Sequence, residues 1–319
     1  MTPWLIGILL ALLIVAALWR SLGLRVWLLR KIFGGPGPGQ GPADLESRKA
    51  ALSIRRDLVY PSPDGDGRYD LYLPAGEGPF PVVVWVHGGA FVAGDKANVS
   101  NWAVMLAHAG YAVAALNYRW APELAFPGQA RQIQAALAAL RAHPQLDVTR
   151  VALAGDSAGA YLALQAGLIT VKPAFSAALG VSPALPPEAL KALVLCCGCY
   201  RLIPHGRDFA SRLLGRSVGW ALFGRRDWAA LPTAPLTDLI SQVTSGLPPC
   251  YIADGNTGSF EEDGRALAAA LEQAGVAAVT RFYGREAGAV GHEYQFDLLT
   301  PQGVETWEEA LDFLHKFLP

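Results

Sequence analysis

The sequence has 319 residues, of which 52% are apolar and 17% are charged, and its formal net charge is −1. This length suffices for one sizeable domain and an additional segment, and a charge so close to zero gives no electrostatic reason to expect a nucleic-acid partner. The four cysteines are too few, in a chain of this length, for the disulfide framework of a small secreted protein.

Residues 1–33 predict an N-terminal membrane anchor. Residues 4–19 carry no charge and, together with residues 1–3, are just long enough to cross a bilayer as one helix. Basic and apolar residues then alternate up to Phe33, which is typical of an amphipathic segment at the membrane surface. Because the basic residues follow the apolar run, the positive-inside rule predicts that the rest of the chain lies in the cytoplasm. A cleaved signal peptide is the alternative, with residues 15–17 as its cleavage site, although no Lys or Arg precedes the apolar run.

Residues 34–42 alternate Gly with Pro and predict a flexible linker, so we expect the folded domain over residues 43–319. The domain begins with two short strand-like runs, Asp57–Tyr60 and Arg68–Leu73. A segment rich in Pro, Asp and Gly separates them. This arrangement predicts an antiparallel hairpin at the edge of a sheet.

Apolar strands then alternate with helices. The predicted strands are Val82–Val86, Tyr111–Leu116 and Arg150–Ala154, and the predicted helices are Asn98–His108 and Gln129–Ala142. Since the strands lack polar alternation, we expect them to be buried on both faces, in a mostly parallel central sheet flanked by helices. Loops at the carboxyl ends of such strands are where ligands bind in α/β sheets.

The first of these strands ends in His87-Gly88-Gly89-Ala90. Glycines without side chains can direct backbone N–H groups into a pocket, so Gly88 and Gly89 are candidate donors to an oxyanion. An ordinary turn at the exit of a strand is the alternative interpretation.

A second motif, Gly155-Asp156-Ser157-Ala158-Gly159, stands between an apolar strand and an Ala- and Leu-rich helix. A sharp strand–turn–helix connection exposes the serine hydroxyl above the sheet, and small residues on both sides leave room for the bend. Ser157 is therefore the candidate nucleophile, and the N–H of Ala158 is a third candidate oxyanion donor. A turn that shares only the spacing is the alternative.

Two later stretches allow two interpretations each. Leu193–Cys197 predicts a further strand, and three cysteines, Cys196, Cys197 and Cys199, lie at its end. A metal site needs more ligands at suitable spacing, so we expect buried, reduced thiols and no metal. Residues 200–248 are rich in Trp, Leu and Arg, and they predict either a cap over the site or ordinary helix packing.

The candidate general base is His292. It lies in a Gly-rich loop between the last predicted strand, Thr280–Tyr283, and a closing amphipathic helix, Val304–Leu318. In this position its imidazole can accept the proton of Ser157 and return it to a leaving group. A surface histidine without a role is the alternative, and His315, inside the helix, is a poor candidate.

Three motifs carry a family resemblance: His87–Phe91, the run Asn117–Glu123 with Phe126-Pro127, and Gly155–Gly159. From about residue 55 onwards the chain resembles the α/β-hydrolase superfamily, and it is most similar to the hormone-sensitive-lipase-like esterases. The resemblance implies an α/β-hydrolase fold and a serine hydrolase of esters or related acyl compounds, without metal or organic cofactor.

The triad acid is where the sequence departs from this family. The resemblance implies an orienting Asp near residues 258–260, where this chain has Gly258. The nearby substitutes are Asp254, at the end of the strand Cys250–Asp254, and Glu261, Glu262 and Asp263 at the start of the next helix. We favour Asp254, because a residue at a strand end is held rigidly, whereas acidic residues at a helix N-terminus also have a structural role.

The sequence therefore predicts a membrane-anchored carboxylic-ester hydrolase that forms an acyl-enzyme on Ser157. The expected partners are a small ester substrate and the membrane, and no nucleic acid. Two alternatives remain. The same groups also cleave amides, as in an arylformamidase or a peptidase. The missing aspartate is the one feature that favours a non-catalytic binding protein on this fold.

Overall fold

An eight-stranded sheet is the centre of the computed structural model, which describes residues 2–34, 37, 39–202 and 209–319. The strand order is β1-β2-β4-β3-β5-β6-β7-β8. β2 pairs antiparallel with β1 and with β4, and all other neighbours are parallel. The strands are β1 Ser53–Tyr60, β2 Gly67–Leu73, β3 Phe80–Val86, β4 Ala112–Leu116, β5 Leu146–Asp156, β6 Leu190–Cys196, β7 Cys250–Asp254 and β8 Ala278–Phe282. The predicted edge hairpin and the mostly parallel sheet are confirmed.

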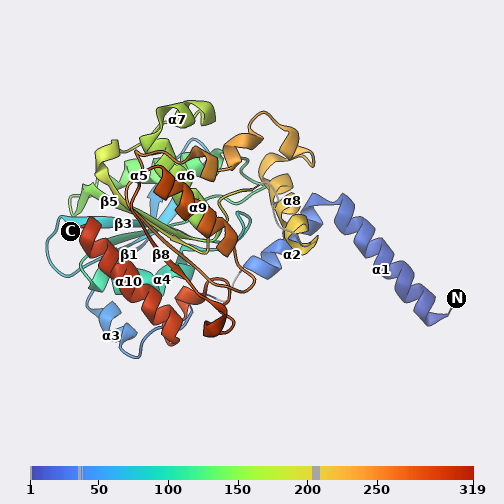
Figure 1. Ribbon diagram of the computed structural model, residues 1–319, viewed down its shortest axis with the longest axis horizontal. Helices are drawn as coiled ribbons and strands as arrows, with labels where there is room; N and C mark the ends of the chain where they lie inside the picture. The colour runs from blue at the N-terminus through green and yellow to red at the C-terminus, as the bar shows by residue number, and fades with distance from the viewer. Residues whose placement is uncertain (1, 35–36, 38, 203–208) are drawn as a thin grey trace.

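Helices cover both faces of this sheet (Figure 1). α5, α6 and α9 contribute to the core on one face, and α4 and α10 to the core on the other. The helices of the described residues are α1 Pro3–Arg20, α2 Leu22–Phe33, α3 Leu45–Ala50, α4 Ser100–His108, α5 Gly128–Leu140, α6 Ala158–Val171, α7 Pro173–Leu179, α8 Phe209–Phe223, α9 Glu261–Gln273 and α10 Pro301–Phe317.

Strand β3 shows how the sequence builds two cores. Val82, Val84 and Val86 belong to the core under α5 and α6, while Val83 and Trp85 belong to the core under α4 and α10. Successive side chains of a strand point to opposite faces, so an uninterrupted apolar run is required when both faces are covered. The chemistry-bearing loops consequently gather at the carboxyl edge of the sheet.

The N-terminal segment divides into two helices of different character. α1 points away from the sheet and its helices, and its apolar side chains are exposed, for example Trp4 at 62% and Val15 at 61% (Figure 1). α2 turns back and packs against α8, with Val26 and Leu29 buried in the domain core. The predicted anchor therefore contains a helix that is part of the folded body.

Within the described residues, a single helix that is both long and apolar enough to cross a membrane does not occur. The segments Pro3–Ala17 and Leu22–Phe33 meet that standard only when taken together, across a bend of 97°. The pair Ala158–Val171 and Pro173–Leu179 meets it in the same way, but α6 is a core helix of the domain.

The predicted linker and cap lie partly outside the described residues, which omit 35–36, 38 and 203–208. At the end of the linker, the backbone is bound to the domain: Gly39 O accepts from Asn101 Nδ2 at 3.1 Å, and Gln40 O accepts from Leu298 N at 2.9 Å. Of the predicted cap, the described part contains α8 and three short 3₁₀ turns between residues 228 and 242.

Candidate active site

Ser157 stands at the sharp turn between β5 and α6. Its backbone has φ 52° and ψ −119°, an uncommon conformation for a residue with a side chain. A Cβ at Gly159 would lie 1.9 Å from Val86 O, and one at Gly155 would lie 2.4 Å from the Gly159 backbone. Both glycines leave room for this bend, as predicted, and the turn directs the Ser157 hydroxyl above the sheet edge.

His292 lies beside Ser157, in the loop between β8 and α10 where the sequence predicted the base. Its Nε2 is 3.0 Å from Ser157 Oγ, and the ring meets Phe260 edge to face at 5.4 Å. Burial lowers the pKa of His292 to about 4. The imidazole is therefore neutral at physiological pH, which is the form that accepts a proton from a serine.

The other ring nitrogen reaches a residue that the sequence analysis missed. His292 Nδ1 is 2.7 Å from Ser259 Oγ, and the Ser259 hydroxyl donates to Asp254 Oδ1. Among the described residues, no hydrogen bond joins Asp254 directly to His292. Ser259 directly follows Gly258, the position where the family resemblance implies an Asp. Its spacing from Asp254 was visible in the sequence, but its contact with the histidine loop was not.

None of the competing acids has a hydrogen bond to His292 among the described residues, and Glu262 is exposed. Glu261 binds Arg265 at 2.7 Å, and Asp263 accepts from the backbone and guanidinium of Arg201. Asp254 remains the acid connected to the imidazole. It is 1% exposed, and its Oδ2 has no N–H or O–H donor among the described residues.

Burial is the main influence on the charge of Asp254. Burial raises its pKa to about 7, while the hydrogen bond from Ser259 acts in the opposite direction. The other titratable groups near its carboxylate are Cys196, Cys197, Cys199, Tyr200 and Glu261. His292, whose ligand-type nitrogen lies within 4.8 Å of the carboxylate, is neutral at physiological pH, so burial keeps the pKa of Asp254 near 7 rather than near 4.

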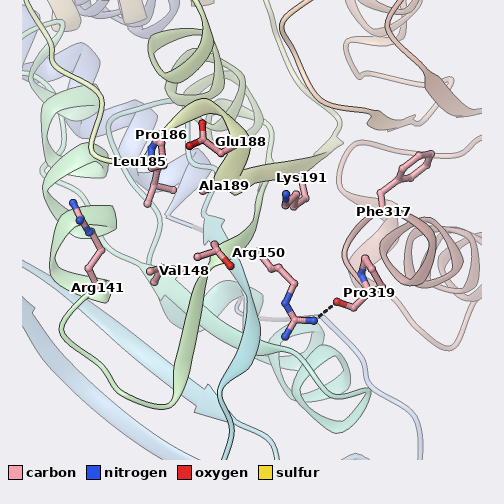
Figure 2. A pocket seen from close by; sticks show the side chains of 11 residues that line it. Arg141, Val148, Arg150, Leu185, Pro186, Glu188, Ala189, Lys191, Phe317 and Pro319 are labelled. Carbon is pink, nitrogen blue, oxygen red and sulfur yellow. Dashed lines mark hydrogen bonds between the residues drawn. The ribbon is translucent and has the colours of Figure 1, made fainter.

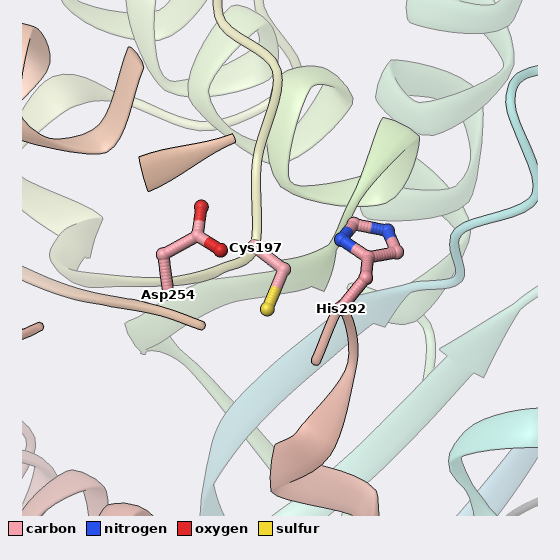
Figure 3. Close-up of side chains that lie close together, drawn as sticks. All are labelled: Cys197, Asp254 and His292. Atoms are coloured by element: carbon pink, nitrogen blue, oxygen red, sulfur yellow. The ribbon is translucent and has the colours of Figure 1, made fainter. Parts of the chain in front are cut away.

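Cys197, Asp254 and His292 form the one cluster of potential metal ligands among the described residues, with ligand-type atoms within 4.8 Å of one another (Figure 3). Metal binding requires a thiolate, but burial and the nearby Asp254 charge raise the pKa of the Cys197 thiol well above its usual value. His292 Nδ1 and Asp254 are also already bridged by Ser259. This donor set fits a hydrogen-bonded cluster better than a metal ion.

The four thiols are free, and Cys196 and Cys197 are buried as the sequence predicted, whereas Cys199 is only partly buried. The prediction that Cys197 lies in the strand was wrong by one residue, because β6 ends at Cys196. Cys197 has φ 51°, so the alternation of a strand does not determine which side chains it faces.

The three predicted oxyanion donors differ in whether their N–H group already has a hydrogen-bond acceptor. Gly88 N donates to Asp156 Oδ2 at 2.7 Å, so that N–H is already engaged. The N–H groups of Gly89 and Ala158 have no acceptor among the described residues. Gly89 has φ 107°, and Ala90 and Phe91 after it also have positive φ, which produces a tightly curved loop beside Ser157. Gly89 and Ala158 are thus the donors open to a ligand.

Asp156 and Glu293 form a carboxyl pair behind this loop that the sequence analysis missed. Asp156 is buried and also accepts from Trp85 Nε1 at 2.8 Å. Burial raises the pKa of both groups, and the Asp156 charge adds to the rise at Glu293. The raised pKa of Glu293 favours a neutral Glu293 beside Asp156, and Asp156 fixes the loop through the Gly88 N–H. Neither residue has a sequence signal beyond its place next to Ser157 or His292.

The aromatic residues singled out in the predicted cap have mostly structural contacts. Phe223 stacks on Trp228 at 5.3 Å, and Trp228 is 1% exposed. The guanidinium groups of Arg25 and Arg226 lie over the ring of Trp220, at 5.4 and 4.3 Å. For Phe223 and Trp228 ordinary helix packing is therefore the better interpretation.

A cavity of about 630 Å³ lies elsewhere, at the amino ends of β5 and β6 (Figure 2). Its lining includes Arg141, Val148 and Lys191, and Arg150 donates there to the backbone oxygen of Pro319. None of the residues around Ser157 contributes to it. Since ligands of α/β folds bind at the carboxyl ends of the strands, this cavity is not the site of the serine chemistry.

Comparison with known proteins gives one family and many esterases. The BD-FAE family model matches residues 69–260. The chain is 32% identical to an acetyl-hydrolase of Streptomyces hygroscopicus, over 74% of this chain and 69% of that protein. It is 30% identical to the carboxylic ester hydrolase LipN of Mycobacterium tuberculosis, over 72% of this chain. The alignment spans 62% of LipN and 48% of the Arabidopsis thaliana methylesterase ICME, less than two thirds of either.

Solved structures support the fold. Esterase B from Lactobacillus rhamnosis superimposes with a TM-score of 0.71 at 23% identity, covering 86% of this chain and 90% of that one. At this identity the similarity shows the α/β-hydrolase fold and nothing finer.

Proposed function

Because the chain belongs to the BD-FAE family of α/β-hydrolase-fold proteins, we propose that it hydrolyses carboxylic esters, with Ser157 as nucleophile and His292 as general base. The observation that carries this proposal is the 3.0 Å contact between Ser157 Oγ and a neutral imidazole at a strained turn. The esterase names of the relatives support the same reaction class.

The reaction proceeds in two halves. Ser157 Oγ attacks the ester carbonyl as its proton passes to His292 Nε2, and the N–H groups of Gly89 and Ala158 bind the oxyanion. The tetrahedral intermediate collapses, His292 protonates the departing alkoxide, and an acyl-enzyme remains. Water then attacks the acyl group with His292 as base, which releases the acid and restores Ser157.

Labelling of the full chain with a fluorophosphonate tests the nucleophile. We expect labelling and hydrolysis of p-nitrophenyl acetate, and loss of both in Ser157→Ala. Ser182→Ala, in the loop after α7, is the matched control and should behave like the parent. A parent that neither labels nor turns over esters would favour the binding-protein alternative.

A substrate panel separates ester from amide hydrolysis. p-Nitrophenyl esters of increasing acyl length, an aryl formamide and a dipeptide p-nitroanilide are compared by kcat/KM. We expect the esters to be cleaved fastest, since an ester carbonyl is more electrophilic than an amide carbonyl and its alcohol leaves more readily than an amine. Faster cleavage of the formamide would shift the assignment to an arylformamidase-type enzyme.

We also propose that α1 inserts into a lipid bilayer and that the domain lies in the cytoplasm. Supporting this, α1 exposes apolar side chains along its length and lies apart from the domain (Figure 1). At ~1.5 Å per residue its 18 residues extend about 27 Å, a little less than the hydrocarbon thickness of about 30 Å. Basic residues follow it at the domain side.

Flotation with phosphatidylcholine vesicles tests the insertion. The full chain should float, and Leu10→Arg with Ile14→Arg should leave it in the soluble fraction. Val59→Arg, at an exposed apolar position on β1, is the control and should float like the parent. Digestion of the domain by a protease added to intact cells would contradict the cytoplasmic placement.

A further inference from the structure

We propose that Ser259 is a positioning residue that connects the carboxylate of Asp254 to the imidazole of His292, so that the site works with a four-membered chain in place of a direct acid–histidine contact. The proposal rests on the proposed function, because it explains how the base of that reaction is oriented.

The contacts form one continuous line. Ser157 Oγ is 3.0 Å from His292 Nε2, and His292 Nδ1 is 2.7 Å from Ser259 Oγ. The Ser259 hydroxyl then meets Asp254 Oδ1. A hydroxyl has one proton to donate and lone pairs to accept with, so Ser259 can serve both neighbours at once.

The direction of these bonds follows from the reaction. His292 Nε2 must be free of hydrogen to accept the Ser157 proton, so the ring proton of the neutral imidazole is on Nδ1. Nδ1–H then donates a hydrogen bond to Ser259 Oγ, and the Ser259 O–H donates a hydrogen bond to the Asp254 carboxylate. When Ser157 loses its proton to Nε2, the imidazolium keeps Nδ1–H, and its positive charge is stabilised through the polarised Ser259 hydroxyl. No proton leaves Ser259 or reaches Asp254.

The fold holds this line in place from both ends. Asp254 is the last residue of β7, and a Cβ on the following Gly255 would lie 2.3 Å from Gly291 O, next to the histidine. Phe260 packs edge to face on the His292 ring. The β7 loop and the histidine loop are therefore in direct contact, with the Ser259 side chain between their functional groups.

A double-mutant cycle on the full chain tests this relay, the hydrogen-bonded connection from Asp254 through Ser259 to His292. Steady-state hydrolysis of p-nitrophenyl acetate is measured for Ser259→Ala, Asp254→Asn and the double variant. Loss of a hydrogen bond to a charged group predicts about 10- to 100-fold lower kcat in Ser259→Ala, with little change in KM. Asp254→Asn should lower kcat about as much in the parent and almost not at all in the Ser259→Ala background, because the effects of residues in one hydrogen-bonded network are not additive.

Two further variants separate the relay from a structural role. Ser259→Thr keeps the hydroxyl and should recover most of the kcat lost in Ser259→Ala. Ser176→Ala removes a buried serine that donates to Val181 O at 2.7 Å, far from the site, so it should lower stability without lowering kcat. If Asp254→Asn does not fold, the comparison of the alanine and threonine variants still decides the question.

The outcomes distinguish this inference from the proposed function. The relay is overturned if Ser259→Ala keeps the parent kcat, if the alanine and threonine variants lose kcat equally, or if the effects on kcat in the cycle are additive. In each case hydrolysis that depends on Ser157 still supports the esterase. If the parent has no ester hydrolysis that depends on Ser157, both the relay and the proposed esterase function are overturned.

Discussion

Removing the Arg30 side chain should loosen α2 from the domain and slow the proposed ester hydrolysis. Arg30 Nε donates to Val92 O at 2.9 Å, its Nη2 donates to Ala121 O at 3.3 Å, and the same Nη2 lies 2.5 Å from Glu123 Oε2. Val92 directly follows the curved loop that presents the Gly89 N–H, so this arginine joins an N-terminal helix to the wall of the active site.

The magnitude follows from the exposure of these groups. The Arg30 and Glu123 side chains are 31% and 49% exposed, so solvent screens the ion pair, which contributes at most about 1 kcal/mol. The two bonds from a charged donor to backbone oxygens contribute about 1.5 kcal/mol each, at the lower end of their range. We therefore expect Arg30→Ala to reduce the free energy of unfolding by about 3 kcal/mol, and ~1 kcal/mol shifts the Tm of a large domain by about 2–4 °C.

Thermal unfolding and p-nitrophenyl acetate hydrolysis are measured on the full chain. Arg30→Ala should lower the Tm by several degrees and also lower kcat/KM, because the loop of Gly89 loses a support. Arg225→Ala is the matched control: this arginine pairs with Asp227 on an exposed surface, and its loss should change neither quantity. Equal Tm and kcat/KM in the two variants would refute the view that α2 is part of the catalytic body.

Three further changes have defined outcomes. Asp254 has a pKa of about 7 and stabilises the relay fully only when it is ionised, so kcat/KM should rise with pH to a half-maximum near pH 7. His292 has a pKa of about 4 and stays neutral across this rise. A pH profile whose only rise is near pH 4 would contradict this. Gly159→Ala, whose Cβ would lie 1.9 Å from a β3 carbonyl oxygen, should abolish soluble expression or activity, checked by circular dichroism. In Gly88→Ala the new Cβ would lie 2.5 Å from Asp156 Oδ2, so we expect a large loss of kcat with only a small decrease in Tm. An unchanged kcat would contradict the role of Asp156 and Glu293 in fixing the loop.

Those parts of the fold that depend on local pattern were predictable from the sequence. Apolar runs without polar alternation are required in strands covered on both faces, and β3 and β7 lie almost where the runs predicted them. The start of β5 was missed because residues 146–149 alternate apolar and polar side chains and do not continue the apolar run. They extend the strand along the first residues of β3, at a place where the pairing register shifts.

The division of the N-terminal segment could not be predicted in the same way. Residues 20–33 mix basic and apolar side chains, which is equally suited to a membrane surface and to a helix that packs on a protein. α2 uses both options: Val26 and Leu29 are buried against the domain, while Trp27 and Ile32 are 56% and 60% exposed. Periodicity alone does not indicate which neighbour a helix face will meet, so truncation at residue 43 would remove part of the body together with the proposed anchor.

The acid of the site shows the same limit at the level of one hydrogen bond. The sequence reveals that no carboxylate stands at residues 258–260, and rigidity at a strand end favours Asp254, which the structure connects to His292 through Ser259. It does not reveal that a serine there completes the connection, because that depends on how closely the β7 loop meets the histidine loop. Gly255 permits this approach, having no side chain to collide with Gly291 O. The distance between two loops decides whether a carboxylate or a hydroxyl followed by a carboxylate fits between them. When the expected acid is absent from such a site, the groups between the histidine and the nearest remaining carboxylate therefore decide whether the histidine is still oriented.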